Sequence, residues 1–140
     1  GTIWRGEVIM LDMPGFKQPI GELDTPRLRR LADAAGAEGL GVHLVVKTEL
    51  YRAACEGVEL TVQDLAKSVQ RYCGIGPKKA KNLLKTAEDS GVFRAKNDGF
   101  VQPIAYSPKE DADRYREVSE QRRRAAKAGR WKQQSTGGQL

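Results

Sequence analysis

The sequence predicts a mainly α-helical domain that carries one small β-hairpin. Thr61 and Asp64 form a capping-box pattern, in which each side chain can accept the backbone N–H of the other at the start of a helix. Pro77 suits the first residue of a following helix, and Gly91 suits the left-handed residue that ends it. Asn97-Asp98-Gly99 lies between two short apolar runs, which is a signal for a hairpin turn. This order of elements predicts a winged helix-turn-helix.

A first helix is predicted to begin at Thr25, a good N-cap, with Pro26 at the first helical position. Its apolar residues recur at helical spacing, and Gly36 closes it. These residues are Leu28, Leu31, Ala32 and Ala35. We expect the arginines on the other face, Arg27, Arg29 and Arg30, to be solvated.

Residues 37–54 are predicted to form the longest core helix. The apolar surface is wide enough that we expect burial on more than one side. Its main stripe consists of Leu40, Leu44, Lys47 and Tyr51. Gly39 and Gly41 each cost about 1 kcal/mol relative to alanine in a helix interior. Close packing against a neighbouring helix would offset that cost, and Gly57 is expected to end the segment.

Two shorter helices precede the hairpin. Residues 58–60 are short enough to be the small strand that often comes before the second part of a winged helix. The helices over residues 62–72 and from Pro77 onward each turn an apolar face to the core. The residues of these faces are Val62, Leu65, Ala66, Val69, Ala80, Leu83, Leu84 and Ala87.

The chain divides into four predicted segments. They are a poorly defined N-terminal segment (1–23), the winged-helix domain (24–106), a charged C-terminal helix with a basic tail (107–132) and a disordered end (133–140). Within the first segment, a strand or hairpin over residues 3–11 is the longest element that its prolines and glycines allow. The C-terminal helix is expected to start at Ser107-Pro108 and to run to about Lys127.

Composition and charge limit the function. The chain has 140 residues, enough for one modest core, and a net charge of +6, which favours an acidic partner such as nucleic acid. No apolar run approaches the ~20 residues that a membrane-spanning helix needs. Cys55 and Cys73 lack metal-ligand spacing. We therefore expect a cytoplasmic protein with reduced, partly buried thiols, no metal or other cofactor and no membrane partner.

The helix that begins at Pro77 carries the charge expected of a DNA-recognition helix. Its exposed face would lie in the major groove, with Lys78 and Lys79 near the entry. Asn82 is the candidate for base reading, because asparagine pairs bidentately with adenine. Lys81 and Lys85 would reach phosphates. The alternative is an ordinary helix–helix turn with solvated lysines.

The hairpin supplies two further candidates for DNA contact. Arg94 and Lys96 lie close enough to the predicted wing tip to reach the adjacent minor groove. Asp98 argues against a tip that inserts deeply.

The segment over residues 73–81 also resembles a helix-hairpin-helix. In that motif a Gly-hydrophobic-Gly turn presents backbone N–H groups to a phosphate, and a following lysine adds charge. Such turns usually occur in pairs and are not followed directly by a hairpin, so residues 92–104 favour the winged helix. Under either interpretation residues 74–85 would touch the nucleic-acid backbone.

The C-terminal end holds the densest cationic run. Its candidate DNA-binding residues are Arg122, Arg123, Arg124, Lys127 and Arg130, followed by Lys132. Trp131 could stack on a base or on a partner surface. The acidic residues before this run alternate with arginines in the manner of an exposed helix with i,i+4 pairs. A solvated helix that leads into a disordered tail is the alternative.

The residues do not suggest an enzyme. His43 is the only histidine, and its apolar helix favours a satisfied core or boundary role. Neither cysteine has a base partner that the sequence reveals, and the glycine patterns of nucleotide-binding loops are missing. We expect no catalytic residue.

Several segments together resemble a known family. Gly36-Ala37-Glu38-Gly39-Leu40-Gly41-Val42 is the most distinctive, and the other matching pieces are residues 24–28, 50–51, 65–66, 83–84, 90–93, 119–123 and 129–131. They resemble the N-terminal winged-helix domain of replication-initiator, or replisome-organiser, proteins of phages and mobile elements. The early aromatic-plus-His-Asp segment usual in that family is not evident, so the resemblance covers residues 24–132. It implies DNA binding at a replication origin and recruitment of replication machinery.

The sequence thus leads us to expect a protein that binds duplex DNA through residues 77–85 and the hairpin, assisted by the basic C-terminal end. A rival of another class is a protein-interaction module, an inhibitor or adaptor of replication or defence machinery on the same scaffold. A third, weaker alternative is a nuclease accessory that uses the helix-hairpin-helix-like turn.

Overall fold

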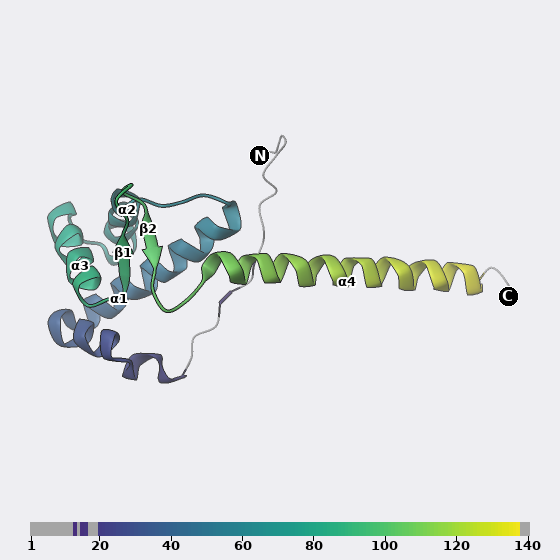
Figure 1. The fold of residues 1–140 in the computed structure, drawn as a ribbon, viewed down its shortest axis with the longest axis horizontal. Coiled ribbons are helices and arrows are strands. Elements are labelled where there is room, and N and C mark those ends of the chain that lie inside the picture. The colour runs from purple at the N-terminus through teal and green to yellow at the C-terminus, as the bar shows by residue number, and fades with distance from the viewer. Residues whose placement is uncertain (1–12, 14, 17–19, 138–140) are drawn as a thin grey trace.

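The computed structural model describes residues 13, 15–16 and 20–137, with residues 130–137 described by their backbone alone. The elements follow one another as a short 3-10 helix, a long bent helix, two short helices, a hairpin and a second long helix (Figure 1). The molecule is mainly helical with a small two-stranded antiparallel hairpin, as the sequence predicts. The strand or hairpin predicted over residues 3–11 lies outside the described residues.

The 3-10 helix η1 (Ile20–Asp24) leads into α1 (Pro26–Glu56). The helix bends at Gly36, whose φ of 60° and ψ of −145° suit glycine and strain other residues. The two predicted helices are therefore two segments of one element, and the break lies at the predicted glycine. Gly57, with a φ of 71°, ends the second segment as predicted.

Of the predicted stripe on the second segment of α1, Lys47 and Tyr51 are buried and Leu40 is half-buried, whereas Leu44 is not buried. Leu44, which we placed on the core stripe, is 56% exposed, whereas His43 and Lys47 are only 7% and 2% exposed. The prediction for Leu44 is wrong because η1 packs on the neighbouring face of the helix. There the Glu22 carboxylate provides a partner for a buried amino group.

The two glycines inside α1 have different explanations. A Cβ on Gly39 would lie 2.8 Å from the Cβ of Ala35 and 3.1 Å from Leu31, so the bend brings the two segments into close contact. Close packing is thus confirmed at Gly39, although the neighbour is the preceding turn of α1 itself. At Gly41 an added Cβ would meet no atom of the described residues within 4 Å, so close packing does not explain that glycine.

The helices α2 (Val62–Cys73) and α3 (Pro77–Asp89) are the two short helices predicted. The capping box at the start of α2 is confirmed: the Asp64 N–H donates to the Thr61 hydroxyl at 3.2 Å, and the Thr61 N–H donates to the Asp64 carboxylate at 2.9 Å. The backbone hydrogen bond from Thr61, aided by its hydroxyl, lowers the pKa of Asp64.

The strands β1 (Phe93–Ala95) and β2 (Val101–Pro103) form the predicted hairpin. The other side of β2 is paired as well, because its first N–H donates to the carbonyl of Leu60 at 2.8 Å. Thr61 also forms a bridge with Phe100. The small strand expected before α2 is therefore present as a short pairing, and β2 lies between it and β1. This arrangement is the one expected of a winged helix.

The helix α4 (Pro108–Gly137) extends away from the rest of the molecule (Figure 1). It starts at the predicted residue but passes the predicted end near Lys127. Residues 133–137, predicted to belong to a disordered end, are helical, and residues 138–140 lie outside the described residues. Residues 121–132, just before that end, are rich in alanine, arginine and lysine, whose high helix propensity favours a helix that passes Lys127. The sequence of residues 133–137, Gln-Gln-Ser-Thr-Gly, holds no such signal.

One core joins the three helices and the hairpin. Its largest fully buried side chains are Phe93, Leu28, Leu31, Leu65, Leu84, Val42, Val46, Val69 and Val92. They come from α1, α2, α3 and the start of the hairpin, so the orientation of α3 is fixed by packing on several sides. In the described part of the chain, no helix combines the length and apolar character needed to cross a membrane.

Candidate nucleic-acid interface

The exposed face of α3 brings together four of the predicted site residues. Lys78, Lys81, Asn82 and Lys85 follow the i, i+3, i+4, i+7 spacing that puts side chains on one side of a helix, and all four are exposed. The opposite side is locked into the core by Ala80, Leu84 and Ala87, which are 0%, 1% and 0% exposed. Because that face fixes the rotation of the helix, the lysine face points to solvent.

The four lysines of α3 differ in their partners. Lys79 lies at the edge of the lysine face, and its ammonium group is 2.7 Å from the Glu38 carboxylate of α1, with both side chains about half exposed. Within the described residues, no carboxylate forms an ion pair with Lys78, Lys81 or Lys85. These three ammonium groups are therefore the ones that can accept an external anion without losing an existing partner.

The turn before α3 fits both motifs that the sequence suggests. Gly74 has a φ of 64° and ends α2, while Ile75 packs against the core. Gly76 precedes the helix without a side-chain cap, so the first backbone N–H groups of α3 depend on solvent or a ligand. The hairpin that follows α3 directly supports the winged-helix interpretation.

The wing residues are tied to neighbouring side chains. The Lys96 ammonium is 3.2 Å from the Glu59 carboxylate and 3.7 Å from that of Asp98, and the hydrogen bond to Glu59 contributes most to raising its pKa. The Arg94 guanidinium donates to the Gln102 side chain at 3.4 Å across the hairpin. The strand β1, which carries Arg94, contacts α3. Lys96 can reach a phosphate only by leaving two carboxylates.

The cations of α4 are remote from α3. Arg122, Arg123, Arg124 and Lys127 are exposed on the part of α4 that extends from the body, while α3 lies at the other end of the molecule (Figure 1). The side chain of Arg130, and those of Trp131 and Lys132, lie outside the described side chains. The structure thus separates the predicted site into two regions.

A buried polar cluster on α1 was missed by the sequence analysis. The Lys47 ammonium is 3.1 Å from the Glu22 carboxylate, and it lies over the rings of Phe16 and Tyr106 at 5.0 and 5.3 Å. His43 stands one turn before Lys47 with its Nε2 at 3.4 Å from the same carboxylate. The available signal was the lysine on an apolar stripe, because a buried lysine almost always has a charged partner.

The environment of His43 disfavours its charged form. Neither ring nitrogen has a hydrogen-bond partner among the described residues. Burial lowers the pKa of His43 below its usual value, and the nearby charges of Lys47 and Arg27 lower it further, whereas Glu22 acts in the opposite direction. Its burial confirms the expected core or boundary position of His43, but the prediction of a satisfied ring is wrong, because neither nitrogen forms a hydrogen bond with the described residues.

Tyr51 of α1 contacts both Phe16 and the start of α4. The ring of Tyr51 stacks on Phe16 with a centroid distance of 4.7 Å, and its hydroxyl donates a hydrogen bond to the Asp111 carboxylate. Burial, followed by this hydrogen bond, raises the pKa of Tyr51. This contact holds only the beginning of α4 against the body.

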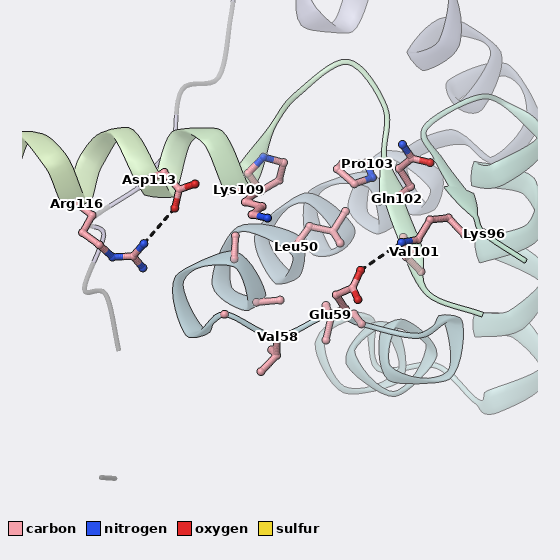
Figure 2. Close-up of a pocket in the computed structure, with 15 residues that line it drawn as sticks. Leu50, Val58, Glu59, Lys96, Val101, Gln102, Pro103, Lys109, Asp113 and Arg116 are labelled. Carbon is pink, nitrogen blue, oxygen red and sulfur yellow. Dashed lines mark hydrogen bonds and ion pairs between the residues drawn. The ribbon is translucent and has the colours of Figure 1, made fainter. Parts of the chain in front are cut away.

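A groove of about 610 Å³ lies between the end of α1, β2 and the start of α4 (Figure 2). Leu50 and Val101 belong to its apolar lining, and ion pairs stand at two of its sides. These pairs are Glu59 with Lys96 and Asp113 with Arg116. Because its cations are largely neutralised, the groove lacks the charge that a nucleic-acid site needs.

The described residues contain no group of three His, Cys, Asp or Glu side chains placed to hold a metal ion. Cys55 is buried and Cys73 half-buried, and no disulfide joins them. Their burial agrees with the expected partly buried cysteines. The chain matches no protein-family model, no curated protein and no solved structure.

Proposed function

We propose that this protein binds duplex DNA, with the lysine face of α3 against the phosphate backbone and the hairpin beside it. The observation that carries the proposal is the set of three exposed ammonium groups without an ion-pair partner among the described residues, Lys78, Lys81 and Lys85. Because the opposite face of α3 is packed into the core, the backbone that carries these lysines is already ordered, and only their side chains have to be ordered when they contact phosphates. Such contacts release counterions from DNA and supply most of the non-specific affinity.

The roles of the remaining residues follow from their surroundings. Asn82 lies on the same face as the three lysines and is the side chain placed to read a base edge, preferably adenine. Lys79 can exchange its exposed pair with Glu38 for a phosphate, because such surface pairs contribute only about 0.2–1 kcal/mol. Lys96 is held by two carboxylates, so the wing contributes less than α3.

The resemblance of residues 24–132 to phage and mobile-element replication-initiator domains also supports this function. On that basis the protein would act in the cytoplasm, in replication initiation or its regulation. The order of α2, α3 and the hairpin agrees with such a role. No residue is assigned a catalytic step.

Fluorescence anisotropy with a labelled duplex, repeated over a range of salt concentrations, tests the proposal. The logarithm of the binding constant should fall linearly with the logarithm of the salt concentration, and K78Q/K81Q should reduce the slope by about 2, or about 0.9 per lost phosphate contact. The matched control is R52Q/R114Q. It removes the same charge, but from cations already paired with Glu49 and Asp111.

The control should keep the wild-type slope. An equal loss in both double variants would mean that net charge, rather than α3, determines the affinity. If no salt-dependent binding to duplex DNA is found, the proposal is wrong, and the protein-interaction module becomes the better hypothesis, with the groove of Figure 2 as the place to examine.

A further inference from the structure

The helix α4 is divided by charge along its length. Residues 107–120 contain five acidic and three basic side chains. Residues 121–137 contain no acidic side chain and six basic ones, which are Arg122, Arg123, Arg124, Lys127, Arg130 and Lys132. We call residues 121–137 the basic half of α4. The preceding residues, 107–120, are the acidic half. The start of α4 contacts α1, whereas the basic half extends away from the rest of the molecule (Figure 1).

The basic half has no packing partner among the described residues. Every residue from Glu120 to Gly129 is exposed, and alanine is the largest apolar side chain in that range. A helix that is polar on all sides gains no stability from packing within its own domain. The extended position of the basic half therefore leaves all of its sides accessible to another molecule. At 1.5 Å per residue, residues 121–137 extend about 25 Å.

The charge distribution of the basic half differs from that of α3. Successive residues lie 100° apart around a helix, so Arg122, Arg123 and Arg124 already point in three directions. Cations on several sides suit a helix that lies between two phosphate walls, as in the major groove of a duplex. The lysines of α3, by contrast, occupy one face only.

A second copy of the chain is a poorer partner for the basic half. Antiparallel pairing of two α4 helices would set the basic half of one against the acidic half of the other. Two of the five carboxylates there are already engaged, however, because Asp111 accepts from Tyr51 and Asp113 pairs with Arg116 at 3.1 Å. Apart from Trp131, residues 121–137 also lack the large apolar side chains, repeated at heptad spacing, that a stable helix pair buries.

We propose that the basic half of α4 is a second duplex-binding surface, so that one copy of the chain holds two DNA segments, one at α3 and one at α4. This inference rests on the proposed function of α3. The two surfaces lie at opposite ends of the molecule, and the acidic half of α4 lies between them (Figure 1). Its exposed carboxylates, at Glu110, Glu117 and Glu120, repel a single duplex that would run from one surface to the other.

A two-colour capture experiment tests the inference. One short duplex is fixed to a bead, a second fluorescent duplex is added, and capture of the second duplex by the full-length chain is measured at low salt. K78Q/K81Q and R123Q/K127Q should each reduce capture at least about tenfold, because each removes two phosphate contacts from one surface. R52Q/R114Q, with the same loss of charge, should capture as well as the wild type. Sedimentation should show a monomer without DNA.

Three results would overturn the inference. Normal α3-dependent binding of one duplex without capture of a second would reject the role of α4 and leave the proposed function intact. A dimer that R123Q/K127Q dissociates would make the basic half a self-association surface. Failure to bind any duplex would reject both proposals together. Circular dichroism of R123Q/K127Q, which should match the wild type, shows that a loss of capture does not come from a loss of helix.

Discussion

The lysine face of α3 and the polar cluster of α1 both present lysine side chains from a helix, yet the surroundings of these lysines are opposite. Lys47 is 2% exposed, and its ammonium lies 3.1 Å from the Glu22 carboxylate. Lys78, Lys81 and Lys85 are exposed and form no ion pair within the described residues. The same residue type therefore stabilises the fold at Lys47 and is available to a ligand on α3.

This difference has a measurable consequence. A buried charge that loses its partner destabilises the fold, because the remaining charge stays away from water. An exposed charge without a partner contributes little to stability, so its loss is felt only when a ligand binds. Substitutions in the cluster should therefore change the free energy of unfolding, and substitutions on α3 should change affinity.

The largest effect is expected at Lys47. K47M keeps the apolar stem but leaves the Glu22 carboxylate without its lysine, which should lower the free energy of unfolding by about 3–5 kcal/mol. Urea denaturation measures the change. The double variant E22Q/K47M should recover part of the loss, because it removes the uncompensated charge. If K47M lowered the free energy of unfolding by less than about 1 kcal/mol, the polar cluster of α1 would not be an important contributor to stability.

The second-largest effect on stability is expected at Gly36, the glycine at the bend of α1. G36A should lower the free energy of unfolding by about 1–3 kcal/mol, because φ of 60° with ψ of −145° is open almost only to glycine. G41A is the matched control, since Gly41 is helical and an added methyl group meets no described atom within 4 Å. It should stabilise the protein by about 0.5–1 kcal/mol. Equal changes in the free energy of unfolding for G36A and G41A would contradict the claim that the bend requires a glycine at residue 36.

The pH dependence of stability provides a smaller test of the cluster. Because the folded pKa of His43 is lowered below 6.5, the unfolded chain takes up a proton more readily than the folded one. Stability from this residue is therefore complete above pH 6.5 and declines as the pH falls below it. Denaturation midpoints between pH 7.5 and 5 should fall less for H43Q than for the wild type. An identical decline in both proteins would show that His43 does not titrate in this way.

The smallest effect on stability is expected on α3. K78Q/K81Q should change the free energy of unfolding by no more than about 0.5 kcal/mol, because both side chains are exposed and neither has an ion-pair partner among the described residues. Thermal denaturation of the variant and the wild type provides the measurement. A loss comparable to that of K47M would remove the distinction between the two regions.

Local signals in the sequence were sufficient for the starts of α1, α2 and α3 and for the hairpin, but not for η1 or for the end of α4. Thr61 with Asp64, Pro77 and Gly36 each act within a few residues, and each lies where the sequence placed it. The exposed face of α3 was also predictable, because the spacing of Ala80 and Leu84 determines which side of the helix is buried.

Contacts between distant segments could not be predicted in the same way. The burial of Lys47 depends on η1, which brings Glu22 to it from 25 residues away, and apolar periodicity contains no information about such a partner. The separation of α3 from the basic half of α4 depends on the direction in which α4 leaves the body. The start of α4 is held against α1 by the buried Ala112 and by the hydrogen bond of Tyr51 with Asp111, which pairs residues 60 positions apart.

Amide spectra of the ¹⁵N-labelled full-length chain, recorded while an unlabelled duplex is added, test the central claim most directly. The amides of residues 78–85 should shift in proportion to bound duplex, while those of residues 43–51 stay in place. Shifts confined to the groove residues 57–60 and 109–116, with α3 unchanged, would contradict a DNA-binding role for the lysine face.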